Sequence, residues 1–352
     1  MPIPELLERL LTTPGPSGQE EAAAAVWREA AAAFGEVETD VLGSSQVRVP
    51  GTAGGPSLAV IGHIDEIGAV VTHVGDDGFA ALRPLGGWDP HVLLGQRVEV
   101  LTRAGRIPGV VVARKQKVKR GADRKVLEHD DLVLDLGARD GEEARSLVRV
   151  GDAFVAAGPP LELRNGRVAS RSFDNRIGCY VALEVARRVA EAGGAPGDVH
   201  GLAVVQEEVG DFAGARTTAF GLEPAVAIAV DVTHASDVRG GDPADDGEVK
   251  LGGGPSLTRG PSLHPGIFEL LSETAEAEGI ACQLEVTRGH THTDADAFYL
   301  SRRGIATGLV SVPLRYMHSP AEVAELGDIE AAIRLLVAFA RRLEPGTTFA
   351  RG

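Results

Sequence analysis

Four short apolar runs recur along the chain, at residues 58–61, 202–205, 226–230 and 308–312. Each is followed directly by glycine, proline or a polar residue. A short apolar run of this kind is typical of a strand that is buried on both faces, as in a parallel sheet covered by helices. This recurrence limits the fold more than any other feature of the sequence.

Helical patterns lie between and around these runs. Four leucines near the start of the chain recur at helical spacing, and an alanine-rich segment follows a break rich in proline and glycine. The helices predicted after this break are 20–34, 176–192, 266–278 and 329–343. Strands that alternate with helices of this length predict an α/β fold, with a mixed, largely parallel sheet flanked by helices.

The middle third of the chain has a different pattern. Short alternating stretches such as 96–101 and 109–112 are separated by glycine-rich turns, and only 142–147 has a helical pattern. This arrangement predicts a small β domain inserted into the α/β domain. The expected insert is 70–160, with 1–69 and 161–352 forming the α/β domain.

The charge of the chain limits its partners. Among 352 residues, 35 are Lys or Arg and 50 are Asp or Glu, which gives a formal net charge of −15. Binding to nucleic acid requires a basic face, so no nucleic acid partner is expected, and an anionic membrane surface is disfavoured for the same reason. No stretch approaches 18 uninterrupted apolar residues, so no membrane span is expected either.

The two cysteines, Cys179 and Cys282, are too few for a disulfide framework. Isolated thiols suit a reducing compartment. The acidic amino terminus also lacks the basic region of a secretory signal peptide. The expected location is therefore the cytoplasm.

Residues that can bind metal ions follow each of the four apolar runs. They are His63, Asp65, Glu207, Glu208, Asp231 and His318. In open α/β sheets, ligands bind beyond the carboxyl ends of the strands, so these side chains are expected to converge on one crevice. Imidazoles and carboxylates without thiolates suit zinc, cobalt or manganese.

Two pairs of these residues suggest a division of roles. His63 and Asp65 face the same side of an extended chain, so one can bind metal while the other accepts the second imidazole N–H. Glu207 and Glu208 would point to opposite sides of a strand, which suits one ligand and one free base. Taken singly, the pairs also fit a strand-end histidine and a solvated acidic face, and only the joint pattern favours a metal site.

Asp174 directly precedes the helix predicted at 176–192. The simplest interpretation is an Asx helix cap, which would serve only the helix. The amino end of a helix also favours a carboxylate electrostatically, so a cap and a metal ligand are compatible.

Other motifs are less specific. No Gly-x-Ser-x-Gly elbow is present, which disfavours a serine hydrolase. The basic run 114–125 is interpreted as a solvated hairpin of the insert, with steering of anionic ligands as the alternative.

Five motifs occur in order: GHIDEIG (62–68), SFDNRIGC (172–179), VQEEVG (205–210), DVTHASD (231–237) and PLRYMHSPAEV (313–323). With them the chain resembles family forty-two of the metallopeptidases, the di-metal tetrahedral (TET) aminopeptidases, also labelled glutamyl aminopeptidase, deblocking aminopeptidase or cellulase M. The resemblance runs nearly end to end and includes the insert, where 86–100, 131–138 and 148–152 look like the family's PDZ-like dimerisation domain. It implies a zinc-peptidase-like α/β domain with a small β-barrel insert.

The resemblance implies a set of metal ligands. His63 and Asp231 would hold one divalent ion. Glu208 and His318 would hold a second, and Asp174 would bridge the two. The implied ions are Zn²⁺ or Co²⁺.

Glu207 would be the general base, and Asp65 would orient His63. The implied reaction releases amino-terminal residues from peptides, using a water that bridges the two ions. Two alternatives remain, namely an endo-glucanase, which is a label that some relatives carry, and a non-catalytic metal-binding subunit. A glycosidase needs two carboxylates but no metal ion, and loss of Glu207 would mark a non-catalytic subunit.

The resemblance also implies self-association into dimers and a hollow dodecamer, and a cis peptide bond between Asp174 and Asn175. Two segments depart from the family pattern. The turn 211–215 is one residue longer than usual, and His290 and His292 lie in a segment that is typically Gly-Gly-Thr-Asp-Ala. Both segments are expected to border the substrate pocket.

Overall fold

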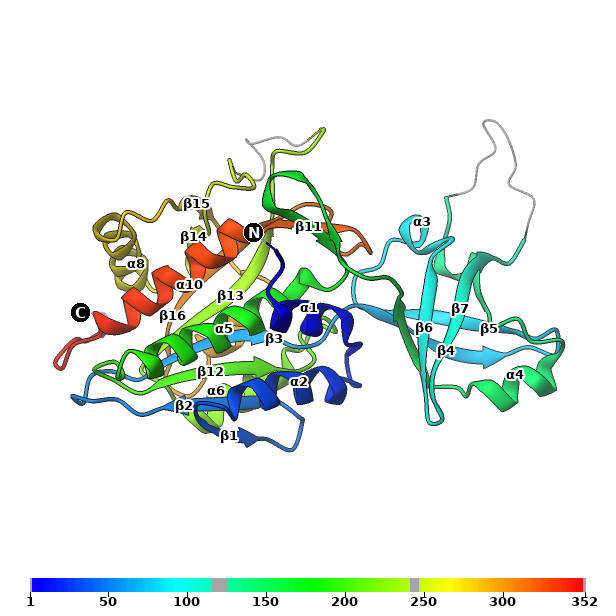
Figure 1. The fold of residues 1–352 in the computed structure, drawn as a ribbon, viewed down its shortest axis with the longest axis horizontal. Helices are drawn as coiled ribbons and strands as arrows, with labels where there is room; N and C mark the ends of the chain where they lie inside the picture. Colours follow the sequence, from blue (N-terminus) through cyan, green and yellow to red (C-terminus); the bar gives the residue numbers. More distant parts are fainter. Residues whose placement is uncertain (1, 116–125, 241–246, 351–352) are drawn as a thin grey trace.

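The computed structural model describes residues 2–115, 126–240 and 247–350. A larger α/β body and a smaller β-barrel lie side by side along the longest axis of the molecule (Figure 1). Most of the basic run predicted to be a hairpin falls on 116–125, outside the described residues.

A sheet of eight strands forms the centre of the α/β body. Its strands are β1 (Glu36–Thr39), β2 (Ser45–Val49), β3 (Leu58–His63), β12 (Val199–Val204), β13 (Val226–His234), β14 (Ser256–Arg259), β15 (Gln283–Val286) and β16 (Ala306–Leu314). Their order is β1-β2-β12-β3-β13-β16-β14-β15. The four central strands β12, β3, β13 and β16 run parallel to one another. Antiparallel pairs join β1 to β2, β2 to β12, and β14 to β16, so the predicted mixed, largely parallel sheet is confirmed.

The central strands are buried on both faces, as their apolar sequences predict. In β3, the side chains of Leu58 and Val60 belong to the core on one face of the sheet. Ala59 and Ile61 belong to the core on the other face. Alternate residues of one strand therefore stabilise two separate layers.

Helices cover both faces of the sheet. The helices that share the larger core are α1 (Glu5–Thr12), α2 (Glu21–Ala31), α5 (Phe173–Glu191), α8 (Pro265–Ala277) and α10 (Leu326–Arg341). The opposite face is covered by α6 (Ala213–Leu222) and α9 (Ala295–Phe298). In Figure 1, α5 and α10 cross in front of the sheet. The helices predicted at 20–34, 176–192, 266–278 and 329–343 are confirmed, with shifts of at most three residues at their ends.

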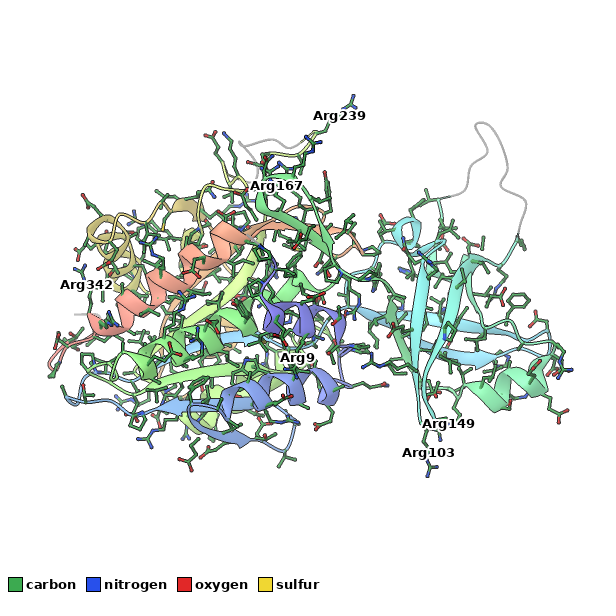
Figure 2. All side chains as sticks on the ribbon, in the orientation of Figure 1. Arg9, Arg103, Arg149, Arg167, Arg239 and Arg342 are labelled. Atoms are coloured by element: carbon green, nitrogen blue, oxygen red, sulfur yellow. The ribbon has the colours of Figure 1, made fainter. Side chains whose placement is uncertain are left out.

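The amino-terminal helices are held to the core by their apolar faces. Leu10 of α1 and Trp27 of α2 are fully buried, and Trp27 Nε1 donates a hydrogen bond to the carbonyl oxygen of Cys179 (2.9 Å). The exposed side chain of Arg9, which is labelled in Figure 2, pairs with Glu29 at 2.6 Å. Both helices thus pack their apolar side chains into the core.

The barrel is closed by six antiparallel strands in the order β4-β5-β8-β7-β6-β9. These strands are β4 (Gly68–Val74), β5 (Phe79–Leu85), β6 (Arg97–Thr102), β7 (Gly105–Ala113), β8 (Leu132–Asp135) and β9 (Ala153–Ala156). Short helices α3 (Pro90–Leu93) and α4 (Gly141–Leu147) complete it, and Arg103 and Arg149 project from its surface (Figure 2). The barrel has a core of its own. Its strands fall in the same part of the chain as the predicted insert 70–160.

A third, small sheet lies where the chain leaves the barrel and enters the α/β body. It contains β10 (Leu161–Glu162), β11 (Arg167–Ser170) and β17 (Glu322–Glu325), all antiparallel. Ser170 pairs with Glu322. This pairing places Glu322 beside the segment that leads from β11 into α5.

Two further findings concern the chain as a whole. Among the described helices, none combines the length and the apolar character needed to cross a membrane. Cys179 is buried, Cys282 is partly buried, and both are unpaired.

Candidate active site

The carboxyl ends of the central parallel strands meet at one edge of the sheet. His63 is the last residue of β3, and Asp231 lies in the second half of β13. Glu207 and Glu208 follow β12, and His318 follows β16. The structure therefore brings together residues from all four strands, and the predicted convergence is observed.

Asp174 reaches this edge from the start of α5. The helix approaches β3 so closely that a Cβ on Gly62 would overlap the carbonyl carbon of Gly178. Asn175 Nδ2 donates a hydrogen bond to the carbonyl oxygen of Val230 (2.8 Å) and thereby joins the helix to β13. The peptide bond between Asp174 and Asn175 is cis, as the resemblance implies.

The interpretation of Asp174 as the helix cap is wrong. Asp174 and Asn175 both have non-helical backbone angles, so regular helix begins only after them. Asn175 Oδ1 accepts the backbone N–H of Gly178 at 2.9 Å and acts as the cap. The carboxylate of Asp174 instead faces two histidines.

Two groups of ligand-type residues share Asp174. The first group is His63, Asp174 and Asp231, the second group is Asp174, Glu208 and His318, and within each group the ligand atoms lie within 4.8 Å of one another. Asp174 Oδ1 lies 3.2 Å from His63 Nε2, and Asp174 Oδ2 lies 3.3 Å from His318 Nε2. His63 Nε2 is 4.0 Å from Asp231 Oδ1, and His318 Nε2 is 3.4 Å from Glu208 Oε2. One carboxylate thus faces both groups.

Asp65 lies behind His63 and is completely buried. Its Oδ1 atom is 3.3 Å from His63 Nδ1. The same carboxylate accepts the backbone N–H groups of Glu207 and Glu208 (3.1 Å each) and the hydroxyl of Ser17 (2.7 Å). The sequence predicted only the contact with His63, and the other three contacts show that Asp65 also fixes the Glu207–Glu208 dipeptide.

The expectation that Glu207 and Glu208 lie on a strand is wrong. Strand β12 ends at Val204, and Gln206 adopts a left-handed backbone with φ 59°. The backbone N–H groups of Glu207 and Glu208 therefore donate to Asp65 and not to a neighbouring strand. The two side chains still differ in position, because Glu208 belongs to the second group whereas Glu207 belongs to neither and has its Oε2 atom 3.8 Å from His63 Nε2.

The site contains more carboxylates than its histidines can balance. Burial raises the pKa of Glu207 to about 10 and that of Glu208 to about 7, and nearby carboxylates add to both shifts. Burial opposes the charged form of His318, but Asp174 and Glu208 raise its pKa to about 11. Only additional positive charge can keep these crowded carboxylates ionised together.

Glu322 is a site residue that the sequence reasoning missed. Its Oε2 atom accepts the backbone N–H of Asp174 (3.2 Å), and its Oε1 atom accepts that of His318 (3.0 Å). Burial and the charge of Asp174 raise the pKa of Glu322 well above its usual range. The only signal in the sequence was its position four residues after His318 in the same motif.

A buried ion cluster beneath the site was also missed. Glu66 accepts the backbone N–H of Gly15 (3.0 Å) and pairs with both Arg171 and Arg176. Arg176 Nη1 in turn donates to the carbonyl oxygen of Leu10 (2.7 Å). These contacts hold the segment between α1 and α2 against the site.

The segment 288–294 approaches the site through Asp294. Both oxygens of this carboxylate are buried without a hydrogen-bond partner among the described residues. Burial raises the pKa of Asp294 to about 7, with the charges of Asp65 and Asp174 contributing. His290 and His292 are exposed on the same segment, and their role at a substrate pocket stays a prediction. The same holds for the turn 211–215, whose last three residues form the start of α6.

Comparison with known proteins shows which family the chain belongs to. The family model for M42 glutamyl aminopeptidase matches residues 43–335. The lysyl aminopeptidase of Pyrococcus furiosus is 33% identical over 351 residues, which cover 97% of each chain.

Solved structures agree with this assignment. The TET aminopeptidase from Thaumarchaeota archaeon SCGC AB-539-E09 is 35% identical, with a TM-score of 0.91 over 97% of each chain. The TET1 peptidase of Pyrococcus horikoshii, which can assemble into a tetrahedron or a large octahedral shell, is 31% identical, with a TM-score of 0.84 over 96% of this chain and 99% of that one. An endoglucanase from Thermotoga maritima is 28% identical, with a TM-score of 0.75 over 95% of this chain and 96% of that one. The chain therefore belongs to the M42 glutamyl aminopeptidase family, and it is an enzyme of the aminopeptidase class.

Proposed function

We propose that the protein is a two-ion aminopeptidase that removes residues from the amino termini of peptides. The observation that carries this proposal is the shared carboxylate of Asp174, whose two oxygens face His63 and His318 separately. A single carboxylate between two His-and-carboxylate groups suits a pair of divalent ions. His63 and Asp231 would hold one ion, and Glu208 and His318 the other.

The residues present fit two divalent cations. Each group offers one imidazole and two carboxylates, which suits zinc or cobalt. Glu208 Oε1 is buried without a hydrogen-bond partner among the described residues, as expected where a polar atom serves an ion site. When bound, the ions would polarise the scissile carbonyl and lower the pKa of the attacking water.

The chain's own residues would move the protons and hold the geometry. Glu207 belongs to neither group, so its carboxylate is available to take a proton from the attacking water and to deliver it to the leaving amine. Asp65 would keep His63 in one orientation and fix the backbone of Glu207.

The two rival functions fit less well. A glycosidase requires two carboxylates on either side of a glycosidic bond, whereas here every carboxylate of the two groups is paired with a histidine. A non-catalytic metal-binding subunit would not need Glu207, which is present and buried beside His63. Assays with a panel of aminoacyl-nitroanilides and with a β-glucan would separate the two enzymatic functions.

The decisive experiment compares Glu207→Gln with Glu208→Gln. Glu207→Gln is expected to retain two ions per chain but to lose about 100- to 10,000-fold in kcat, because an amide cannot accept the proton. Glu208→Gln is expected to lose one ion. Elemental analysis combined with kinetics measures both effects. Loss of metal in Glu207→Gln, or near-normal turnover, would show that Glu207 is not the base.

Two broader features belong to the same proposal. The barrel would be the dimerisation module, and dimers would build a dodecamer, because the structure of PhTET1-12s, with a TM-score of 0.84, is a dodecamer. The unpaired Cys179 and Cys282 suit a reducing compartment, so the enzyme would work in the cytoplasm.

A further inference from the structure

A loop of the barrel reaches the second group of ligand residues. After β5 ends at Leu85, Gly86 and Gly87 turn the chain into Trp88 and α3. A Cβ built on Gly87 would lie 2.5 Å from His318 Nδ1 and 2.8 Å from His318 Cε1. The imidazole of His318 therefore lies directly against the backbone of a residue from the barrel.

Gly86 makes a similar approach to the other ligand of the second group. A Cβ on Gly86 would lie 2.5 Å from Ile67 Cγ2 and 3.4 Å from the Cβ atom of Glu208. By contrast, none of the three atoms nearest to such a Cβ on Gly86 or Gly87 belongs to His63, Asp174 or Asp231. The loop thus approaches one half of the site.

The loop is fixed to the barrel. Trp88 is 6% exposed and belongs to the hydrophobic core of the barrel. Its backbone N–H donates to the carbonyl oxygen of Gly86 (3.2 Å), and its own carbonyl oxygen lies 3.0 Å from His129 Nε2. The position of Gly87 is therefore set by the packing of the barrel.

We propose that the barrel is a part of the active site, and that Gly87 is a positioning residue that determines where the imidazole of His318 stands. The absence of a side chain at 87 lets His318 lie close enough to the carboxylates of Asp174 and Glu208 to form the second ion site with them. This inference rests on the proposed two-ion function. It adds that the barrel shapes the second ion site directly, in addition to any part in assembly.

The test is Gly87→Ala, with Gly221→Ala as the matched control. Both glycines lie outside the left-handed region, so alanine is compatible with either backbone, but a Cβ on Gly221 would meet nothing within 4 Å. Metal-depleted protein is titrated with Zn²⁺ by calorimetry, and the visible absorption of the Co²⁺-loaded protein is recorded. Gly87→Ala is expected to bind the first ion normally and the second about 10- to 100-fold more weakly, in the range known for residues that support a ligand. Gly221→Ala is expected to bind both ions like the wild type.

The outcomes separate this inference from the proposed function. If wild-type protein binds fewer than two ions, the two-ion function fails and the inference fails with it. If the wild type binds two ions and Gly87→Ala binds both with unchanged affinity and an unchanged cobalt spectrum, the inference is overturned while the function stands.

A double-mutant cycle covers the case in which Gly87→Ala loses stability. The added methyl should lower the unfolding midpoint of metal-free protein only while His318 is present. In the His318→Ala background the same methyl should have no effect, because its partner is gone. Equal losses in both backgrounds would show that Gly87 acts through something other than His318.

Discussion

Glu322→Gln is expected to weaken the second ion site without unfolding the protein. Each oxygen of Glu322 accepts one backbone N–H, from Asp174 at 3.2 Å and from His318 at 3.0 Å. Glutamine has the same size but only one carbonyl oxygen, so one of these N–H groups would face an amide donor. The side chain is only 1% exposed, so the orphaned group stays buried. Such a group costs about 1–3 kcal/mol, which sets an upper limit of about 5- to 150-fold on the loss of ion affinity when the ligand segments shift to relieve it.

The assay is a Zn²⁺ titration of metal-depleted protein, followed by kcat and KM on an aminoacyl-nitroanilide. Glu325→Gln on the same strand is the control, because Glu325 pairs with Arg167 (3.3 Å), which is partly exposed to solvent. The control is expected to bind both ions normally, and Glu322→Asp, which is one methylene shorter, should behave like Glu322→Gln. If Glu322→Gln binds the second ion as tightly as Glu325→Gln does, Glu322 does not position the ligands and the reasoning is refuted.

Three further predictions address the rest of the molecule. Chelation should abolish activity and Zn²⁺ or Co²⁺ should restore it; full activity in a sample shown by elemental analysis to be metal-free would contradict the two-ion function. Asp65→Asn should lower affinity at the first group about 10- to 100-fold, since an amide cannot accept from His63, Glu207 and Glu208 together; unchanged Zn²⁺ binding would refute this. Light scattering of metal-replete protein should show a homo-oligomer, most simply twelve subunits, and a monomer at micromolar concentration would contradict the assembly proposal.

The fold and most of the candidate site could be predicted because they depend on local pattern. The apolar run that became β3 shows how: residues 58–61 carry no helical periodicity, so burial on both faces is the simplest way to remove them from water. Once the strands are parallel, their carboxyl ends lie at one edge of the sheet. His63 and Asp231 meet there because β3 and β13 are neighbours in the sheet. The helix predicted at 176–192 followed in the same way from one apolar face.

The misassigned details depend on contacts between distant residues. Asp174 and Asn175 are both residue types that cap helices, and contacts with distant residues orient them: Asn175 bonds to Val230, whereas Asp174 faces His63 and His318. The end of β12 depends on the left-handed backbone of Gln206, a residue type that rarely adopts φ above zero. Such features are set by tertiary packing and leave no periodic trace in the sequence.

The two halves of the site are supported in different ways, and this explains where the missed residues lie. The first group takes His63 and Asp231 from paired strands, whose ladders already fix their backbones. The second group takes Glu208 and His318 from irregular segments, and His318 itself has φ 59°. A backbone of that kind is stable only when the surrounding structure determines it. Glu322 accepts the backbone N–H of His318, and Asp65 accepts that of Glu208. Gly87 limits where the imidazole of His318 can stand. Substitutions at Glu322 and Gly87 should therefore affect the affinity of the second site more than the stability of the fold, whereas Asp65 contacts residues of both groups.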